Sequence, residues 1–293
     1  YISVTNGIAN MQSMENSVTD IRRAGMVWRT AYDYASKYFF EFSGRYDGSY
    51  LFQKGHRWGW FPSVSGGWRL SEEPFMEKVK KYLNLSNLKL RFSWGQMGDD
   101  QYNGNDIVAP YSYLDGYTYG SGNAVLNGNT VTGVVYRGIP ITTLTWIKST
   151  LINIGLDLGL FNDRLIGSFD IFQRKRTGLP ALRYDVLIPS EIGYSLANEN
   201  LNSDYNKGLE FGLTWKDQVK DFTYSLAGNF TLARMMTGKS YKPRFGSSWD
   251  YYRNSTEDRW AYTNWGYQVV GRFQNYQQIQ NYKVDNDGQG NTT

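Results

Sequence analysis

The feature that most constrains the fold of this chain is an alternation of apolar and polar residues that recurs in segments of about ten residues. In segment 151–160, L-I-N-I-G-L-D-L-G-L, every even position holds Ile or Leu, and the odd positions from 153 on hold Asn, Gly, Asp and Gly. Because successive side chains of a strand point to opposite faces, this pattern predicts β-strands with one apolar and one polar face, about eight or nine in all. The segments are 37–46, 58–70, 87–94, 151–160, 208–215 and 222–232, and less completely 27–35, 164–175 and 266–275.

The links between these segments alternate in length. An intermediate link at 71–83 is predicted to form a short helix that begins at Ser71 and carries Glu72 and Glu73 in an acidic first turn. Short turns on one side of a sheet and long loops on the other are typical of antiparallel transmembrane β-barrels. The sequence predicts short links at 35–37, 161–164 and 216–221, and long ones at about 98–145, 176–206 and 233–265.

Composition agrees with strands that cross a membrane. Aromatic residues make up 17% of the chain, and Gly is abundant at 31 residues. Mean hydropathy is only −0.54, and no stretch approaches the roughly 20 apolar residues of a spanning helix. A barrel strand needs no such stretch, because only alternate side chains meet lipid. Rings near strand ends are expected to form an aromatic girdle, whose candidates are Trp28, Trp58, Trp60, Trp68, Trp94, Trp146 and Trp215.

Several classes of function are disfavoured. The chain has no Cys and a single His, His56, so neither a thiolate metal site nor a His-based catalytic triad can be assembled. A net charge of +4 without a Lys/Arg run does not indicate a nucleic-acid partner. We therefore expect no enzyme activity, no catalytic or metal-binding residues, and a solvated loop position for His56.

An oxygen-rich tail, K-V-D-N-D-G-Q-G-N at 283–291, partly matches a calcium-binding loop. It lacks the Glu that would bind the ion through both oxygens, and D-N-D-G is also ordinary turn sequence. We expect no cofactor, with calcium at this tail as the alternative. R-Y-D-G-S at 45–49 and D-Y-N-K-G at 204–208 are likewise predicted to be turns.

The long links carry the candidate binding residues. Exposed aromatic rings can stack on sugars or pack against a partner protein, whereas buried ones pack the loops against each other. The sequence leaves both interpretations open. The candidates for substrate or partner binding are Tyr113, Tyr117, Tyr119, Trp249, Tyr251, Tyr252 and Trp260.

The longer motifs resemble a known family. R-Y-D-G-S-Y-L-F (45–52) is followed by R-W-G-W-F-P-S-V-S-G-G-W-R-L-S-E-E-P-F-M (57–76) and L-K-L-R-F-S-W-G-Q-M-G (88–98). Next come T-W-I-K-S-T-L-I-N-I-G-L-D-L-G-L-F-N-D-R-L-I-G-S-F-D (145–170), N-K-G-L-E-F (206–211) and G-R-F-Q-N (271–275). In this order they resemble the barrel of SusC/RagA-type TonB-dependent transporters. Two departures are Ile147 and Lys148, where the family usually has Glu after the Trp, and R-K-R-T-G-L-P (174–180), which matches only loosely.

This resemblance implies an all-β fold: a segment of a large antiparallel transmembrane β-barrel of about 22 strands, with short periplasmic turns and long extracellular loops. Residues 1–293 are expected to be part of that barrel domain, without its N-terminal plug and C-terminal strands, in the outer membrane of a Gram-negative bacterium. The whole protein is expected to import oligosaccharides or peptides.

Its expected partners are a SusD-like surface lipoprotein, the TonB complex through the N-terminal part, the ligand and outer-membrane lipid. Two alternatives remain on the sequence alone. One is a soluble, aromatic-rich carbohydrate-binding β-domain, and the other is a small passive porin.

Overall fold

The computed structural model describes residues 21–119, 124–186, 188–189, 191, 193–241, 245–264, 266, 268–269 and 271–282. The chain divides into two units, Tyr1–Ala261 and Tyr262–Thr293. In the second unit the described residues form a short helix, α3 (Tyr276–Gln280). No helix in the described part of the chain combines the length and the apolar character needed to cross a membrane.

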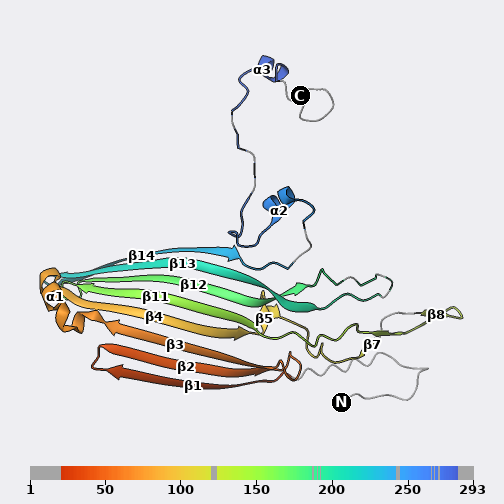
Figure 1. Ribbon diagram of the computed structural model, residues 1–293, viewed down its shortest axis with the longest axis horizontal. Helices are drawn as coiled ribbons and strands as arrows, with labels where there is room; N and C mark the ends of the chain where they lie inside the picture. The colour runs from red at the N-terminus through yellow and green to blue at the C-terminus, as the bar shows by residue number, and fades with distance from the viewer. Residues whose placement is uncertain are drawn as a thin grey trace. The chain divides into compact units, whose positions relative to one another are not determined.

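Long strands of the first unit form one eight-stranded antiparallel sheet, in which each strand pairs with its neighbours in the sequence (Figure 1). β1 and β14 are the two edges of this sheet. Such a meander is the arrangement of an up-and-down barrel wall. The strands are β1 (Arg23–Tyr34), β2 (Tyr38–Ser49), β3 (Trp58–Arg69), β4 (Leu85–Asp99), β11 (Ile147–Leu160), β12 (Leu165–Leu182), β13 (Asn198–Val219) and β14 (Phe222–Thr237).

Alternation in the sequence predicted all eight of these strands. The further candidate at 266–275 is wrong, because its described residues are not in a strand. Among the described residues, pairing beyond β14 is limited to an isolated bridge between Met236 and Trp260. Gly266 and Gly271 interrupt the pattern in 266–275, and a Gly has no side chain to pack on a sheet face.

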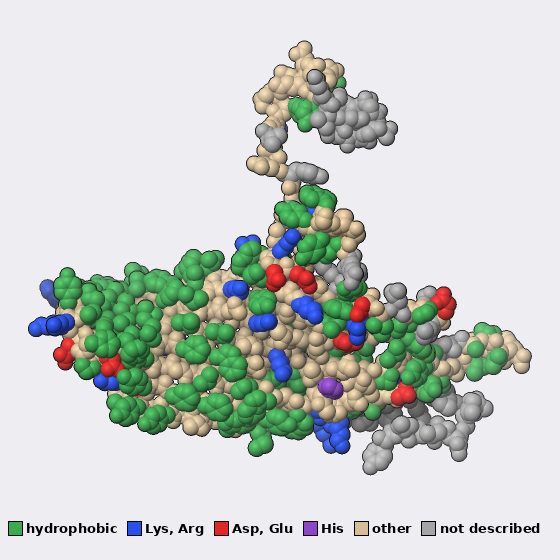
Figure 2. All heavy atoms as spheres, viewed as in Figure 1, with side chains coloured by type: hydrophobic (Ala, Val, Ile, Leu, Met, Phe, Trp, Pro, Cys, Tyr) green, Lys and Arg blue, Asp and Glu red, His purple; other side chains and the backbone are tan. Residues whose placement is uncertain are grey.

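One apolar face runs across the whole sheet because the register keeps like residues side by side. Leu156 of β11 pairs with Leu90 of β4 and Phe169 of β12, and Phe169 pairs in turn with Phe211 of β13. Leu90, Phe169 and Phe211 remain open to the surroundings, and Phe211 is 44% exposed. Figure 2 shows hydrophobic side chains gathered over the strands toward the turn end of the sheet. An apolar surface of this breadth is what a lipid-facing barrel wall presents.

The opposite face of the sheet is polar and carries ion pairs. Arg91 of β4 lies between two carboxylates, with its Nε 2.9 Å from Asp157 and its Nη2 2.8 Å from Asp170. Gly155 leaves room for this cluster, since a Cβ there would come within 2.5 Å of Asp170 Oδ1. Barrel strands place such residues toward the lumen.

Tight turns join the strands at one end of the sheet, the turn end. Ala35 and Ser36 have φ values of 54° and 53°, as the two central residues of a primed turn require, and the Lys37 N–H donates to the Tyr34 carbonyl at 3.0 Å. The turn after β11 is fastened to β4, because the Ser86 hydroxyl donates to Asp163 Oδ1 at 2.7 Å. Links 35–37 and 161–164 are confirmed as short, and the predicted link 216–221 shrinks to two residues between β13 and β14.

A longer connection between β3 and β4 also lies at the turn end (Figure 1). It contains the 3₁₀ turns η2 (Leu70–Glu72) and η3 (Pro74–Met76) and the helix α1 (Glu77–Leu83). The predicted helix at 71–83 is therefore confirmed only in its second half. Ser71 is buried inside η2 rather than capping a helix, and Glu73 binds side chains of the sheet instead of a helix N-terminus.

Long connections lie at the opposite end, the loop end, and those after β4, β12 and β14 are the predicted ones. They span 50–57, 100–146 and 183–197 and continue after β14. The last contains the helix α2 (Ser248–Asn254). The connection 100–146 contains three small two-stranded sheets: β5 (Gln101–Tyr102) with β6 (Asn105–Asp106), β7 (Tyr117–Tyr119) with β10 (Val134–Tyr136), and β8 (Ala124–Leu126) with β9 (Asn129–Val131).

Three predicted loops or turns are strands in the structure. The predicted link 176–206 is reduced to 183–197, because β12 continues past Gly178 (φ 80°) through a bulge that shifts its register against β13. A bulge breaks the alternation without ending the strand, so the pattern conceals it. R-Y-D-G-S (45–49) lies in β2 and D-Y-N-K-G (204–208) in β13, because strand pairing on both sides overrides local turn preference.

Candidate functional site

Buried side chains at the loop end of the sheet form a cluster that we call the loop-end core. Leu51 and Phe52 are each only 1% exposed. Phe61 lies over Gly98, where a Cβ would come within 1.9 Å of its ring. The cluster anchors the connections 50–57 and 100–146 to the strands. Its members are Tyr50, Leu51, Phe52, Phe61, Ile107, Val108, Leu144, Trp146, Ile147 and Leu179.

Trp146 belongs to this core and not to an aromatic girdle, so its predicted interfacial position is wrong. It is 8% exposed, its indole Nε1 donates to the Arg57 carbonyl at 3.0 Å, and Phe61 meets its ring edge-on. By contrast, Trp58, Trp60 and Trp68 are exposed. Trp146 differs because it lies just before β11, where the incoming connection folds back over the sheet.

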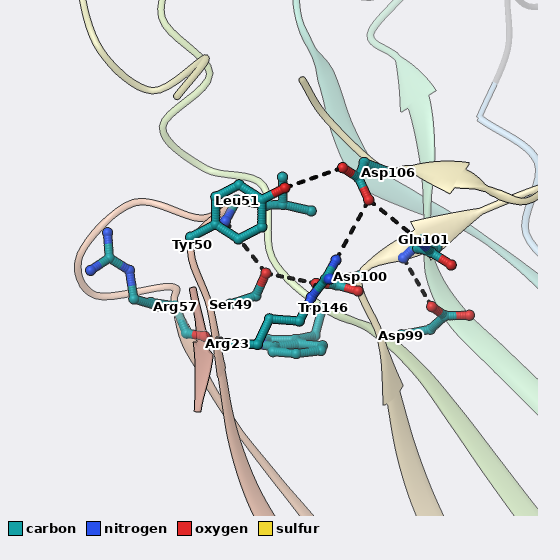
Figure 3. A network of polar contacts seen from close by, with 10 residues as sticks. All are labelled: Arg23, Ser49, Tyr50, Leu51, Arg57, Asp99, Asp100, Gln101, Asp106 and Trp146. Carbon is teal, nitrogen blue, oxygen red and sulfur yellow. Dashed lines mark hydrogen bonds and ion pairs between the residues drawn. The ribbon is translucent and has the colours of Figure 1, made fainter. Parts of the chain in front are cut away.

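A polar network around Asp100 joins four segments of the chain at this end (Figure 3). Asp100 Oδ2 accepts from Arg23 Nε at 2.8 Å and from the Ser49 hydroxyl at 2.7 Å. Asp106 accepts from the Tyr50 hydroxyl at 3.4 Å and lies 3.6 Å from Arg23 Nη2. Burial, reinforced by the Asp106 carboxylate, raises the pKa of Tyr50, so its phenol stays a donor. The network fixes the starts of β1 and of the connection 100–146.

A hollow of about 560 Å³ opens beside this network. Its charged lining comes from Arg23, Arg45, Asp47 and Asp100, and Phe61 and Trp146 add rings. Arg45 and Asp47 are themselves paired at 2.9 Å. A mixed lining of paired charges and rings can bind a polar ligand through hydrogen bonds and stacking.

Tyr113 is held by the loops and is only half-exposed. Its hydroxyl accepts from Arg57 Nη2 at 3.3 Å, and its ring lies 6.3 Å from that of Tyr111. Tyr111 in turn meets Tyr50 of the loop-end core edge-on. For Tyr113 the structure therefore supports the loop-packing interpretation.

Tyr117 lies farther out and is 66% exposed. Its ring packs edge-on against Tyr136 across the β7–β10 pair, and Tyr136 meets Tyr194 of the connection 183–197. Tyr119 is in β7 as well, but its side chain lies outside the described residues. The Tyr117 ring is therefore exposed to the surroundings, while rings from the connections 100–146 and 183–197 pack behind it.

Three of the candidates lie on α2. Trp249 and Tyr252 are 64% and 50% exposed and stack at 5.7 Å between ring centroids. Tyr251, 53% exposed, meets Phe245 edge-on at 5.5 Å. Ser247 caps the helix by accepting from the Asp250 N–H at 3.1 Å. A capped helix gives these rings a fixed direction.

Tyr251 also lines a second hollow, of about 640 Å³, formed by segments 184, 239–241 and 245–257. Tyr184 and Tyr241 lie on it with their centroids 4.8 Å apart. Beside them Arg183 donates two hydrogen bonds to Asp185, which hold the pKa of that carboxyl well below its ordinary range. Rings beside fixed charges and Ser hydroxyls suit a hydroxyl-rich or amide-rich ligand.

Trp260, 40% exposed, is fastened to the sheet. Its backbone bridges to Met236 and its ring receives the Arg234 guanidinium at 4.7 Å. The candidates come from separate segments of the loop end: Tyr113 and Tyr117 belong to the connection 100–146, and Trp249, Tyr251 and Tyr252 to α2.

Catalysis and metal binding find little support in the described residues. His56 is an exposed loop residue, as predicted. No group of three or more His, Cys, Asp or Glu side chains in the described ranges could hold a metal ion. The tail 283–291, the candidate calcium loop, lies outside them.

Sequence reasoning missed the Asp100 network and the loop-end core. Arg23, Ser49, Asp100 and Asp106 are distant in sequence, and their types alone suggest turns. One signal was present: Y-L-F at 50–52 is an apolar run directly after a strand, which indicates burial rather than a solvated loop.

An exposed apolar face, a polar opposite face and connections sorted by length to the two ends together define the wall of a membrane β-barrel. Residues 2–293 match the family model for the TonB-dependent receptor-like β-barrel. The chain belongs to this family of outer-membrane proteins.

Relatives include the TonB-dependent receptor SusC of Bacteroides thetaiotaomicron, 36% identical over 215 residues, which make up 69% of this chain and 19% of that protein. The TonB-dependent receptor P3 of Formosa agariphila is 32% identical over 79% of this chain and 22% of its own length. The chain thus spans about a fifth of the length of these relatives.

Solved structures of the RagAB peptide importer are similar as well. The closed-closed state matches with a TM-score of 0.60 and 26% identity over 78% of this chain and 23% of that one. The open-open state gives 0.61 and 26%, over 77% and 22%. The expected fold, a segment of a large antiparallel barrel with short turns at one end and long loops at the other, is confirmed, and outer-membrane localisation rules out the soluble alternative.

Proposed function

We propose that this chain forms part of the wall and the extracellular loops of an outer-membrane importer for oligosaccharides or peptides, energised through TonB. Residues 1–293 would all belong to its barrel domain. A SusD-like lipoprotein would cover the loop end, and the plug and TonB contacts would come from other parts of the whole protein. No cofactor and no catalytic step are needed.

One observation supports this role above the others. Exposed aromatic rings stand at the loop end of a sheet whose apolar face is exposed across its breadth, so ligand-binding chemistry and membrane anchoring occupy separate surfaces. Among the candidate rings whose side chains the structure describes, Tyr117 and Trp249 are the most exposed. A peptide ligand has additional support from the likeness to the RagAB peptide importer.

We propose two separate contacts at the loop end. The hollow lined by Tyr184, Tyr241 and Tyr251 would bind the ligand through stacking and hydrogen bonds. The stacked pair Trp249–Tyr252, on an exposed helix, would contact ligand or the lipoprotein. Aromatic anchors of this kind dominate the binding energy of interfaces.

Uptake by cells producing the whole protein and its lipoprotein tests the proposal. Fluorescent oligosaccharides and peptides should accumulate, and collapse of the proton gradient should stop accumulation while leaving surface binding intact. Tyr251→Ala should weaken binding about tenfold, as loss of a hot-spot ring does. Leu114→Ala, a loop-end change without a ring, should leave binding unchanged. Accumulation that persists without the proton gradient would instead support a passive porin.

A further inference from the structure

The connection between β3 and β4 is the exception at the turn end. The other turns there span only 35–37, 161–164 and 220–221, whereas this one covers 70–84 and contains η2, η3 and α1. A turn that merely reverses the chain needs two to five residues. The additional length therefore calls for a separate explanation.

This connection folds toward the apolar face of the sheet. Glu73 Oε1 accepts from the Tyr38 hydroxyl at 2.6 Å and from the Trp68 indole N–H at 3.1 Å. Tyr38 pairs with Trp68 across β2 and β3 on that face, and their rings stack at 6.4 Å. Because both rings point outward with the apolar face, the carboxylate that they hold must lie on the same side.

α1 presents apolar side chains to the surroundings. Val79, Tyr82 and Leu83 lie three and four residues apart, so they share one side of the helix. Their exposures are 39%, 87% and 48%, and Phe75 in the preceding turn is 64% exposed. Helices on soluble proteins usually turn such a stripe inward. Here the apolar side points away from the protein.

The remaining side of α1 is basic. Lys80 pairs with Glu72 at 3.1 Å. Lys78 and Lys81 are exposed, and neither makes an ion pair within the part of the chain that the structure describes. Figure 2 shows charged side chains at this end of the sheet, next to the hydrophobic band.

We propose that residues 74–83 form an interfacial anchor that lies on the periplasmic surface of the outer membrane and binds anionic phospholipid. Phe75, Val79 and Tyr82 enter the boundary between headgroups and acyl chains, while Lys78 and Lys81 contact lipid phosphates. Two arguments select lipid as the occupant. The connection that carries the helix is tied to the lipid-facing surface, because Glu73 binds Tyr38 and Trp68 there, and apolar residues flanked by Lys match an anionic bilayer surface.

Depth-dependent fluorescence quenching tests this anchor in the full-length protein in lipid nanodiscs. A bimane label is attached to a single Cys at Tyr82→Cys or Val79→Cys, and at Glu77→Cys on the opposite side of the same helix as the matched control. Lipids brominated near the headgroup should quench the labels at 79 and 82 several-fold more than the label at 77. Equal quenching at 77 and 82 would overturn the proposal. An absence of quenching at 82, which is expected if another protein covers α1, would overturn it as well.

Lipid charge provides the second measurement. Replacing phosphatidylcholine by phosphatidylglycerol should increase quenching at Tyr82→Cys, and Lys78→Gln combined with Lys81→Gln should abolish that increase. Lys54→Gln, in the loop 50–57 at the other end, should leave it unchanged. An increase that survives the double variant would overturn the assignment of these lysines to lipid phosphates. Heat-modifiable migration of every variant confirms that the barrel is folded, so either result is interpretable.

Discussion

The side-chain amide of Asn200 in β13 binds both backbone groups of Thr145. Asn200 Oδ1 accepts from the Thr145 N–H at 2.8 Å, and Asn200 Nδ2 donates to the Thr145 carbonyl at 2.9 Å. The same Nδ2 donates to the Gly178 carbonyl at 2.6 Å. The Asn200 amide therefore joins the end of the connection 100–146 to the bulge in β12 by three hydrogen bonds. It fastens the connection 100–146 at the loop end to the barrel wall.

Asn200→Asp should loosen this connection. The substitution removes both donated hydrogen bonds and places a carboxylate against two carbonyl oxygens, a loss of roughly 1–3 kcal/mol. Hydrogen exchange in residues 141–147 of the full-length protein should accelerate about tenfold or more. Asn198→Asp is the matched control, because Asn198 is exposed in the same strand. Unchanged protection in Asn200→Asp would mean that the loop-end core alone holds the connection.

Leu156→Arg should destabilise the barrel in a bilayer. Leu156 pairs with Leu90 and Phe169 on the apolar face, where lipid cannot solvate a guanidinium, so we expect a cost of about 2–4 kcal/mol near the midplane. The matched control is Ser65→Arg on the polar face, directly across from Glu41. Folding of the full-length protein into lipid vesicles during urea titration measures both. Similar costs for the two variants would contradict the assignment of the faces.

Most of the sheet could be predicted from the sequence because lipid and lumen impose opposite demands on alternate residues. In β11, Ile154 and Gly155 already reveal the two faces, and the order of the strands follows from the tight turns. The bulge at Gly178 could not be predicted, because an added residue shifts the pattern as a loop does. The start of the predicted link 216–221 was likewise misplaced, since β13 stays paired with β14 through Val219, beyond the end of the alternation.

The loop end was harder to predict for a different reason. Trp146 and Trp58 look alike in sequence, yet Trp146 is buried by a connection that returns over the sheet, while Trp58 is exposed. The Asp100–Arg23 pair joins residues 77 positions apart. Such contacts depend on where long connections fold, and no local pattern encodes that. The candidate rings were found by type, but only the structure separates Tyr113 from the exposed ones.

The Glu73 contact should persist at mildly acidic pH. Hydrogen bonds from Tyr38 and then Trp68 lower the pKa of the Glu73 carboxyl. A carboxyl whose folded pKa is depressed stabilises the fold above its unfolded pKa and loses that contribution as pH falls through the folded value. A nitroxide at Phe75→Cys should therefore keep its mobility from about pH 7 to about pH 5 and gain mobility only in stronger acid. With Glu73→Gln added, it should be mobile throughout; an unchanged spectrum would show that Glu73 does not hold η3.

Impermeant cysteine labelling in intact cells should report which end of the sheet faces outward. The chain itself contains no Cys, so single substitutions in a Cys-free full-length protein give a clear signal. Thr130→Cys in β9 and Arg253→Cys on α2 are exposed sites on the two longest loop-end connections. Both should react, or become protected when the surface lipoprotein is present. Asp221→Cys, exposed in the two-residue turn between β13 and β14, is the control for the periplasmic side and should remain unlabelled until the outer membrane is permeabilised.

The expected labelling follows from the topology. Each strand crosses the membrane once, so all tight turns share one side and all long connections share the other. Labelling of Asp221→Cys in intact cells, with no reaction at Thr130→Cys and Arg253→Cys when the lipoprotein is absent, would reverse the orientation and remove the aromatic rings from the ligand's side of the membrane.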